Sequence, residues 1–403
     1  MQTNLADFIK NTAEGREADG ILRKCVHCGF CTATCPTYQL LGDELDGPRG
    51  RIYLIKESLE GQAVTAKTRR HLDRCLSCLS CETTCPSGVR YGRLLDIGRE
   101  LVEKRAPRPV HERAMRKILR WLLPHPRRFA PLLRFGQSLR PLLPAALRRH
   151  VPERSSAGPW PEPRHARRML CLNGCVQSSI APGINAAAAR VLDRLGVSVI
   201  PTTAAGCCGA VSHHLSARAE ARDFMRRNID AWWPRLEQGA EAVITGASAC
   251  TAMVKEYGEL LADDSEYAHK AVRVSELARD LSEVIAGEDL SALGANTVVS
   301  RRVAFHSPCT LQHAQGIRGT VESILDARGH RLTQVRDPHL CCGSAGTYSI
   351  LQQALSKRLR DNKLAALVAG KPDLIATANI GCLVELRAAS NVPVVHWIEL
   401  LDE

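Results

Sequence analysis

The sequence predicts a multi-domain protein, in which an all-α N-terminal domain precedes two α/β domains with parallel sheets. Three observations support this prediction. A run of four cysteines occurs twice near the N-terminus, in a stretch with helical patterns and no strand pattern. Further along the chain, a second kind of cysteine set also occurs twice. Around that second set, short apolar runs alternate with helical patterns, which is typical of β-α-β units.

The two N-terminal cysteine runs share the spacing C-x2-C-x2-C-x3-C-P and lie fifty residues apart. This spacing is typical of bacterial ferredoxins with two [4Fe–4S] clusters, in which the fourth cysteine of each run binds the other run's cluster. Residues 1–104 are therefore predicted to form an all-α, two-cluster ferredoxin-like domain. The expected ligands are Cys25, Cys28, Cys31 and Cys85 for cluster one, and Cys75, Cys78, Cys81 and Cys35 for cluster two. Zinc is the alternative metal, because eight thiolates could hold two zinc ions.

Helical patterns precede Cys25 and cover residues 51–59 and 91–105. Between the two runs, the segment from Asp46 to Arg51 (Asp-Gly-Pro-Arg-Gly-Arg) leads into a helix. Its arginines could offset the negative charge of thiolate-ligated clusters. The alternative is a basic loop that simply begins the helix.

Residues 105–168 form a basic, Pro/Arg/Leu-rich linker. Sixteen Lys and Arg face three Glu there, a local charge of +13 in a chain whose formal charge is +12. Its prolines rule out one long helix and favour short basic amphipathic helices, which suit an anionic membrane surface. A docking segment for an acidic partner, or a solvated linker, is the alternative. Nucleic acid is not expected as a partner, because no recognised binding module accompanies the charge.

Two similar α/β domains are predicted over residues 169–290 and 300–403. Cys175 precedes the Cys207-Cys208 doublet by 32 residues, and Cys309 precedes Cys341-Cys342 by the same distance. Each set closes on a lone cysteine, Cys250 or Cys382. In the first copy we expect strands at 168–172, 197–202 and 242–245, and helices at 185–195 and 214–233. Because the carboxyl ends of parallel strands share one edge, each set of four cysteines should converge there.

These eight cysteines are candidate cofactor-binding residues of a further iron–sulfur or thiol redox centre in at least one copy. Buried structural cysteines or zinc sites are the alternatives. Cys171 has no match in the second copy. His213, His214, His306 and His313 lie near the predicted edges and could relay protons or bind metal, although a structural role is favoured. No catalytic residues are predicted, since the sequence has no G-x-G-x-x-G after a strand and no P-loop.

Two C-x2-C-x2-C-x3-C-P runs followed by two CCG-type cysteine-rich domains resemble the iron–sulfur subunits of glycolate oxidase (glycolate dehydrogenase) over nearly the whole chain. The most similar stretches begin at Asp46 (DGPRGRI), Pro308 (PCTLQH), His339 (HLCCGSAGTYS), Asn379 (NIGC) and His396 (HWIELL). The domains also resemble the CCG domains of heterodisulfide reductase. That enzyme's closing CxxC is absent, which counts against its noncubane cluster here.

The resemblance implies an electron-transfer subunit that does not oxidise substrate alone. A partner FAD-containing subunit would oxidise glycolate to glyoxylate, a second flavoprotein-type subunit would join the complex, and electrons would pass towards a membrane quinone. The alternatives are the equivalent subunit of an anaerobic glycerol-3-phosphate or lactate dehydrogenase, a heterodisulfide-reductase-like thiol enzyme, and a zinc-stabilised scaffold.

The expected location is cytoplasmic and peripheral on the inner face of the cell membrane. The N-terminus has no basic region followed by an apolar core, so no signal peptide is expected. Seventeen cysteines then indicate a reducing compartment rather than a disulfide scaffold. No apolar run reaches the ~20 residues that span a bilayer.

Overall fold

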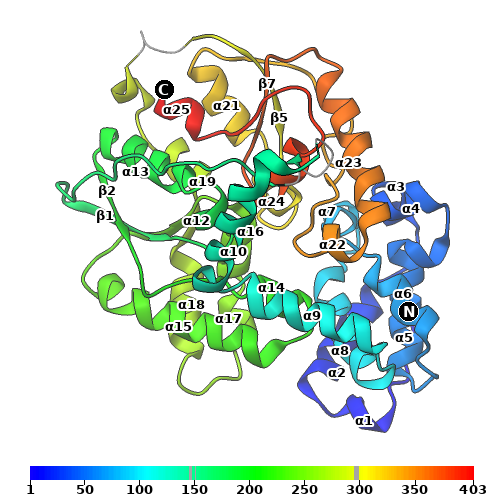
Figure 1. Cartoon of the computed structure of the whole chain (residues 1–403). Coiled ribbons are helices and arrows are strands. Elements are labelled where there is room, and N and C mark those ends of the chain that lie inside the picture. The colour runs from blue at the N-terminus through cyan, green and yellow to red at the C-terminus, as the bar shows by residue number, and fades with distance from the viewer. Residues whose placement is uncertain (145–147, 150, 295–298) are drawn as a thin grey trace.

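The computed structural model describes residues 1–144, 148–149, 151–294 and 299–403. Figure 1 shows a helical N-terminal unit on the right, a first α/β unit at the lower left and a second α/β unit at the top. The two α/β units share one hydrophobic core, the first α/β unit has a second core of its own, and the helical unit has a separate core. The predicted fold class is confirmed.

The N-terminal unit contains no strand among its described residues. Its helices are α1 (Asp7–Lys10), α2 (Ala13–Lys24), α3 (Phe30–Ala33), α4 (Pro36–Leu41), η1 (Glu44–Asp46), α5 (Pro48–Leu59), α6 (Ala66–Asp73), α7 (Ser80–Thr84) and α8 (Tyr91–Arg105). The three helices expected from the sequence correspond to α2, α5 and α8. Pro48 begins α5 at the position where a missing N–H costs nothing. The buried faces of these three helices form the core of the unit, with Leu22, Ile55 and Leu94 fully buried.

The basic segment forms α9 (Val110–Leu122), α10 (Pro126–Leu139) and η2 (Arg140–Leu142). Prolines divide it into short helices, as expected. Pro131 nevertheless lies inside α10, where its ring removes one backbone hydrogen bond from the helix. Among the described residues, no helix combines the length and the apolar character needed to cross a membrane.

The first α/β unit has a four-stranded parallel sheet in the order β2-β1-β3-β4. Its elements are β1 (Arg167–Leu172), α12 (Gln177–Ile180), α13 (Gly183–Arg194), β2 (Val197–Pro201), α14 (Ala210–His214), α15 (Arg218–Glu237), β3 (Ala242–Thr245), α16 (Ser248–Lys255), α17 (Tyr257–Leu260), α18 (Ala268–Leu277), β4 (Ala278–Asp280), α19 (Leu281–Ala286) and η3 (Leu290–Leu293). The helix expected from residue 214 begins four residues later. Ser216 has a φ of 60°, which ends α14 before α15 starts.

The second α/β unit repeats this topology in the order β6-β5-β7-β8, again all parallel. Its elements are β5 (Arg302–His306), α20 (Cys309–Gln312), α21 (Thr320–Ala327), β6 (Arg331–Leu332), α22 (Tyr348–Leu351), α23 (Gln353–Val368), β7 (Leu374–Thr377), α24 (Ile380–Arg387), β8 (Val394–His396) and α25 (Glu399–Asp402). The two sheets confirm the internal repeat that the cysteine spacing predicts.

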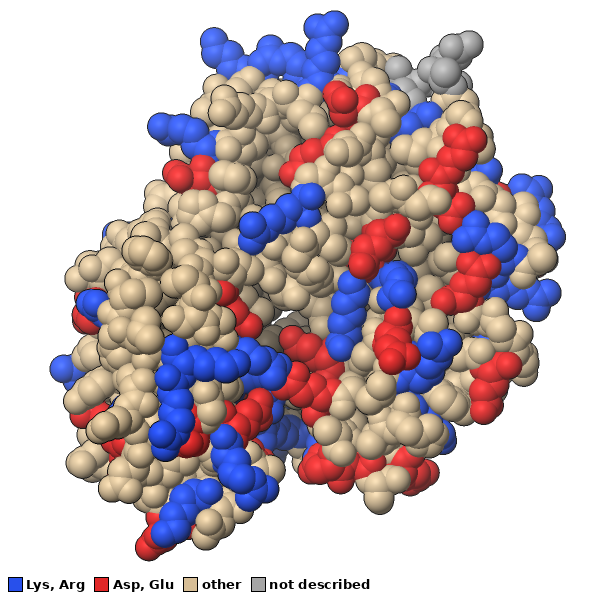
Figure 2. Space-filling model, turned by 180° about the vertical axis from the view of Figure 1, so that it is seen from behind, with Lys and Arg blue, Asp and Glu red and all other residues tan. Residues whose placement is uncertain are grey.

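Side-chain contacts join the helical unit to both α/β units. Arg93 on α8 pairs with Glu17 at 2.8 Å and with Glu259 of the first α/β unit at 2.9 Å. Tyr348 of the second α/β unit donates a hydrogen bond to the carbonyl of Arg74 at 3.1 Å. Figure 2 shows the opposite face, where acidic and basic side chains are interspersed and a hollow opens near the centre. The three units therefore meet around a common interior.

Candidate metal centres

A first small cavity in the helical unit is lined by the four cysteines predicted for cluster one and also by Cys81. Cys25 caps the end of α2, Cys31 lies in α3, and Cys28 lies in the exposed loop between them. The fourth cysteine, Cys85, caps the end of α7 and comes from the other run.

The second cavity has the reciprocal set of four cysteines, and Cys81 lines both cavities. Cys75, Cys78 and Cys81 of the second run line it together with Cys35 of the first run, which begins α4. The structure thus brings together the two groups of four sulfurs that the ferredoxin-type spacing predicts.

Both three-cysteine loops have the same unusual backbone. The residues before and after the second cysteine adopt positive φ in each run: His27 and Gly29 in the first, Ser77 and Leu79 in the second. Turns of this kind point successive backbone N–H groups to one side and form nests that bind anions, including iron–sulfur sites. Leu79 is a costly residue for a left-handed conformation, so the surrounding structure must hold it there.

A buried cation lies beside the second cavity. Arg51 is 1% exposed and donates hydrogen bonds to the carbonyl of His71 at 2.8 Å and to Thr37 Oγ1 at 3.1 Å. Its charge is balanced by Asp46, which is fully buried, with Arg51 Nη2 3.5 Å from Asp46 Oδ1. Asp46 also pairs with His71 at 3.0 Å and with Arg74 at 2.7 Å.

These cations change the acidity of one cavity thiol. Burial by itself would raise the pKa of Cys75, but the charges of Arg51 and Arg99 bring that pKa below its ordinary value. Burial raises the pKa of Cys78 and Cys81 well above the ordinary value, and the charges of neighbouring cysteines add to the effect. The Arg51 side chain therefore favours the thiolate form of Cys75, which is the form that binds metal.

The cysteines of the second α/β unit converge at the carboxyl edge of its sheet, as parallel-sheet geometry predicts. The Sγ atoms of Cys309 and Cys341 are 3.7 Å apart. Thiol hydrogen bonds continue from Cys341 to Cys342 and from Cys342 to Cys382. Hydrogen bonds from the neighbouring thiols hold the pKa of Cys341 well below its ordinary value.

The cysteines of the first α/β unit converge in the same way. Cys207 shares thiol hydrogen bonds with Cys175 and Cys208, and Cys208 shares one with Cys250. Cys171 lies apart in β1, where burial raises its pKa to about 12. It behaves as a core residue.

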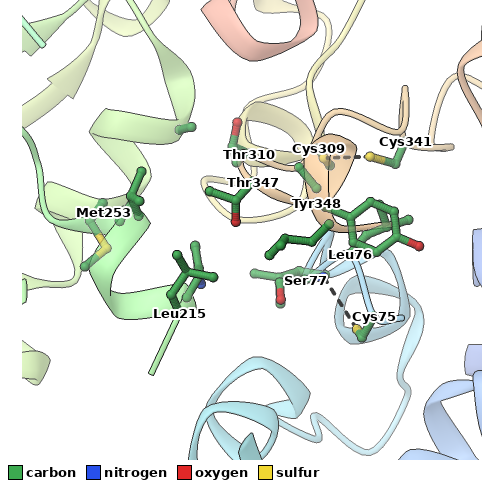
Figure 3. A pocket seen from close by; sticks show the side chains of 18 of the residues that line it. Cys75, Leu76, Ser77, Leu215, Met253, Cys309, Thr310, Cys341, Thr347 and Tyr348 are labelled. Carbon is green, nitrogen blue, oxygen red and sulfur yellow. Dashed lines mark hydrogen bonds between the residues drawn. The ribbon is translucent and has the colours of Figure 1, made fainter. Parts of the chain in front are cut away.

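A cavity of about 210 Å³ lies between the helical unit and the second sheet edge. Figure 3 shows its walls, which the three units share. The helical unit contributes Cys75, Leu76 and Ser77, the first α/β unit Leu215 and Met253, and the second α/β unit Cys309, Thr310, Cys341, Thr347 and Tyr348. The cavity therefore connects the second four-cysteine group of the helical unit with the thiols of the second sheet edge.

Two of the four candidate histidines, His213 and His313, connect an α/β unit to the helical unit. His213 Nε2 lies 3.1 Å from Asp96 on α8. Burial would lower the pKa of His213, but Asp96 raises it above its ordinary value. His313 Nδ1 lies 2.9 Å from Thr83 Oγ1 of α7. His214 faces the cavity, and burial lowers its pKa to about 4.

Sequence analysis missed one acidic group beside the cavity. Burial raises the pKa of Glu256 to about 7, and the nearby carboxylate of Asp96 adds to the effect. Glu256 follows α16 directly, among residues with no motif. No signal in the sequence places it beside α8.

Comparison with known proteins identifies two kinds of domain. The 4Fe-4S dicluster domain family matches residues 21–89. The cysteine-rich domain family matches residues 169–255 and 303–387. The first match contains both cysteine groups of the helical unit, and each of the other two matches contains the four cysteines of one sheet edge.

Whole-chain relatives are also found. The glycolate oxidase iron-sulfur subunit of Escherichia coli (strain K12) is 56% identical over 404 residues, covering 100% of this chain and 99% of that protein. The probable glycolate oxidase iron-sulfur subunit of Bacillus subtilis (strain 168) is 30% identical and covers 98% of this chain and 96% of its own. Lactate utilization protein A of Bacillus subtilis is 26% identical over 57% of this chain, which is 96% of that protein.

The buried Asp46 predicts a measurable dependence of stability on one carboxylate. Asp46→Asn removes the buried carboxylate that pairs with Arg51, His71 and Arg74, so we expect a loss of about 3–5 kcal/mol. The midpoint for thermal loss of the iron–sulfur absorbance should fall by several degrees. Asp7→Asn, which removes an exposed carboxylate, serves as the control and should leave it unchanged. Equal midpoints for Asp46→Asn and the wild type would show that Arg51 is compensated in another way.

Proposed function

The chain belongs to the family of glycolate oxidase iron–sulfur subunits, and on that premise we propose that it carries electrons from a FAD-containing partner that oxidises glycolate to glyoxylate towards a membrane quinone. The observation that carries this proposal is the pair of cavities, each lined by cysteines from both runs. A second flavoprotein-type subunit completes the proposed complex. The proposal also divides the chain into a helical two-cluster domain (1–104), a basic linker (105–168) and two α/β domains (169–290 and 300–403).

The residues around the cavities fit [4Fe–4S] clusters. Each cavity offers at least four thiols, and the left-handed turns beside them form anion-binding nests. Cluster one would take Cys25, Cys28, Cys31 and Cys85, and cluster two would take Cys75, Cys78, Cys81 and Cys35. When bound, such clusters accept and donate single electrons. The protein holds the thiolates in place and supplies a buried cation, Arg51, beside cluster two.

The first cysteine loop is the proposed contact with the flavoprotein. Cys28 is exposed, and the apolar side chains on either side of it, Val26 and Phe30, are 68% and 61% exposed. Exposed apolar groups next to a redox site suit a partner surface. Substrate oxidation itself is assigned to the partner, because the sequence has no flavin-type or nucleotide-type phosphate-binding motif.

A subunit of a lactate-oxidising complex is the second candidate. It is favoured by the relatives named lactate utilization protein A, although these match only 57% of this chain. Relatives named for glycolate oxidase match nearly all of it. Co-purification of the partner flavoprotein, followed by assays with glycolate and lactate, separates the two candidates.

The helices α9 and α10 are the proposed contact with the inner face of the membrane. On α9, Val110, Ile118 and Trp121 are exposed and fall on one side of the helix. On α10, Leu132 and Phe135 are exposed as well. The flanking basic residues are Arg113, Lys117, Arg127, Arg128 and Arg134. A basic helix with an exposed apolar face suits the surface of an anionic bilayer.

The crossed ligand sets predict the outcome of cluster reconstitution. The full chain should bind at least about eight irons with matching sulfide, enough for two [4Fe–4S] clusters. Cys35→Ser should damage cluster two, and Cys85→Ser should damage cluster one, as measured by electron paramagnetic resonance (EPR) of the reduced protein. Cys171→Ser is the control and should leave both spectra intact. Damage to cluster one by Cys35→Ser would show that the ligands do not cross.

Membrane contact can be tested with anionic vesicles at low salt. The wild type should bind, and salt should weaken binding because charges are screened beyond ~8 Å at physiological ionic strength. Replacing Arg127, Arg128, Arg148 and Arg149 by Ser should release the protein. The control variant has the same net charge as the test variant, because four other exposed arginines, Arg16, Arg70, Arg279 and Arg336, are replaced by Ser. It should still bind the vesicles. A wild type that ignores the vesicles but needs α9 and α10 to hold its flavoprotein would make these helices a docking segment.

A further inference from the structure

The two sheet edges are not equivalent, although their cysteines correspond one to one. Three residues before the first cysteine of each set, the last residue of the leading strand is Leu172 in β1 but His306 in β5. The second edge therefore has an imidazole that the first edge lacks.

The position and orientation of the His306 imidazole suit a metal ligand. It is 1% exposed, and its Nδ1 lies 2.9 Å from the Oγ1 of buried Thr377 on the neighbouring strand. Its Nε2 has no hydrogen-bond partner. A ring nitrogen of His306 and the Sγ atoms of Cys342 and Cys382 all lie within 4.8 Å of one another. With Nδ1–H donating to Thr377, the lone pair of Nε2 is free, which is how metal-binding histidines are usually oriented.

The second edge also lies against the helical unit. Cys78, a proposed ligand of cluster two, packs in one apolar cluster with Cys341, Cys309 and Tyr348. The first edge packs around Phe224 instead, with Cys175 and Cys207 in a separate cluster. Among the described residues, no cysteine of the helical unit belongs to that cluster.

We propose that the second sheet edge, and not the first, holds a third iron centre whose donors are the thiolates of Cys309, Cys341, Cys342 and Cys382 and the imidazole of His306. The proposal rests on the proposed electron-transfer function, because cluster two is its electron source. Thiolate and imidazole together suit iron or zinc, and the contact with Cys78 favours the redox-active metal. Electron transfer to this centre would take one electron from cluster two and reduce Fe(III) to Fe(II) at the second edge.

Reconstitution of the full chain with ⁵⁷Fe, sulfide and ¹⁵N-labelled histidine tests the proposal. We expect iron beyond the eight of the two clusters, and nitrogen hyperfine coupling to this extra iron in pulsed EPR. His306→Ala should abolish the coupling and the extra iron, while the spectra of the two clusters persist. His330→Ala is the matched control, because His330 is 2% exposed in the same unit and neither of its ring nitrogens has a partner. It should change neither signal.

Three other outcomes would contradict the proposal, each in a different way. Two intact clusters with no additional iron, or with zinc at the second edge, would overturn the third iron centre and leave the proposed function standing. Extra iron without nitrogen coupling in the wild type would exclude His306 as a ligand, and this measurement does not depend on any variant folding. Iron well below eight in the wild type would count against the proposed function itself, and the third centre would fall with it.

Discussion

The structure depends on one constraint, the exchange of cysteines between the two runs. Cys35 lies with the second run and Cys85 lies with the first, so neither cavity can form unless both runs are folded against each other. The helices that carry cysteines, α3 and α7, are short, whereas the helices that form the core, α2, α5 and α8, are long. Arg51 and Asp46 lie beside the second cavity. Their opposite charges offset the cost of burying a cation there. The same arrangement that holds the sulfurs therefore fixes the fold of the unit.

The second α/β unit is oriented by this helical unit. Tyr348 binds the carbonyl of Arg74, and His313 contacts Thr83, on either side of the loop that carries Cys78. These contacts bring one sheet edge against the second cavity and leave the other edge in a separate apolar environment. The matching cysteines of the two α/β units therefore lie in different environments. The two units can have different roles although their folds repeat.

Much of this was predictable from the sequence. Cysteine spacing predicts the two groups of four sulfurs, and the position of cysteines after apolar runs predicts their convergence at the sheet edges, because both depend on local geometry. The break at Ser216 and the helical Pro131 were not predictable, since surrounding packing decides such conformations. The Asp96–His213 pair and the packing of Cys341 on Cys78 depend on how whole units dock, and no short pattern encodes that.

Electron entry from a flavoprotein is the central claim, and rapid freeze–quench EPR tests it most directly. The chain and its co-purified flavoprotein would be mixed with glycolate under anaerobic conditions and frozen at successive times. The account predicts that both cluster signals develop within one turnover, with magnetic splitting between them, because the two cavities share ligand-bearing segments within one small unit. Formation of glyoxylate while both clusters stay oxidised would contradict it.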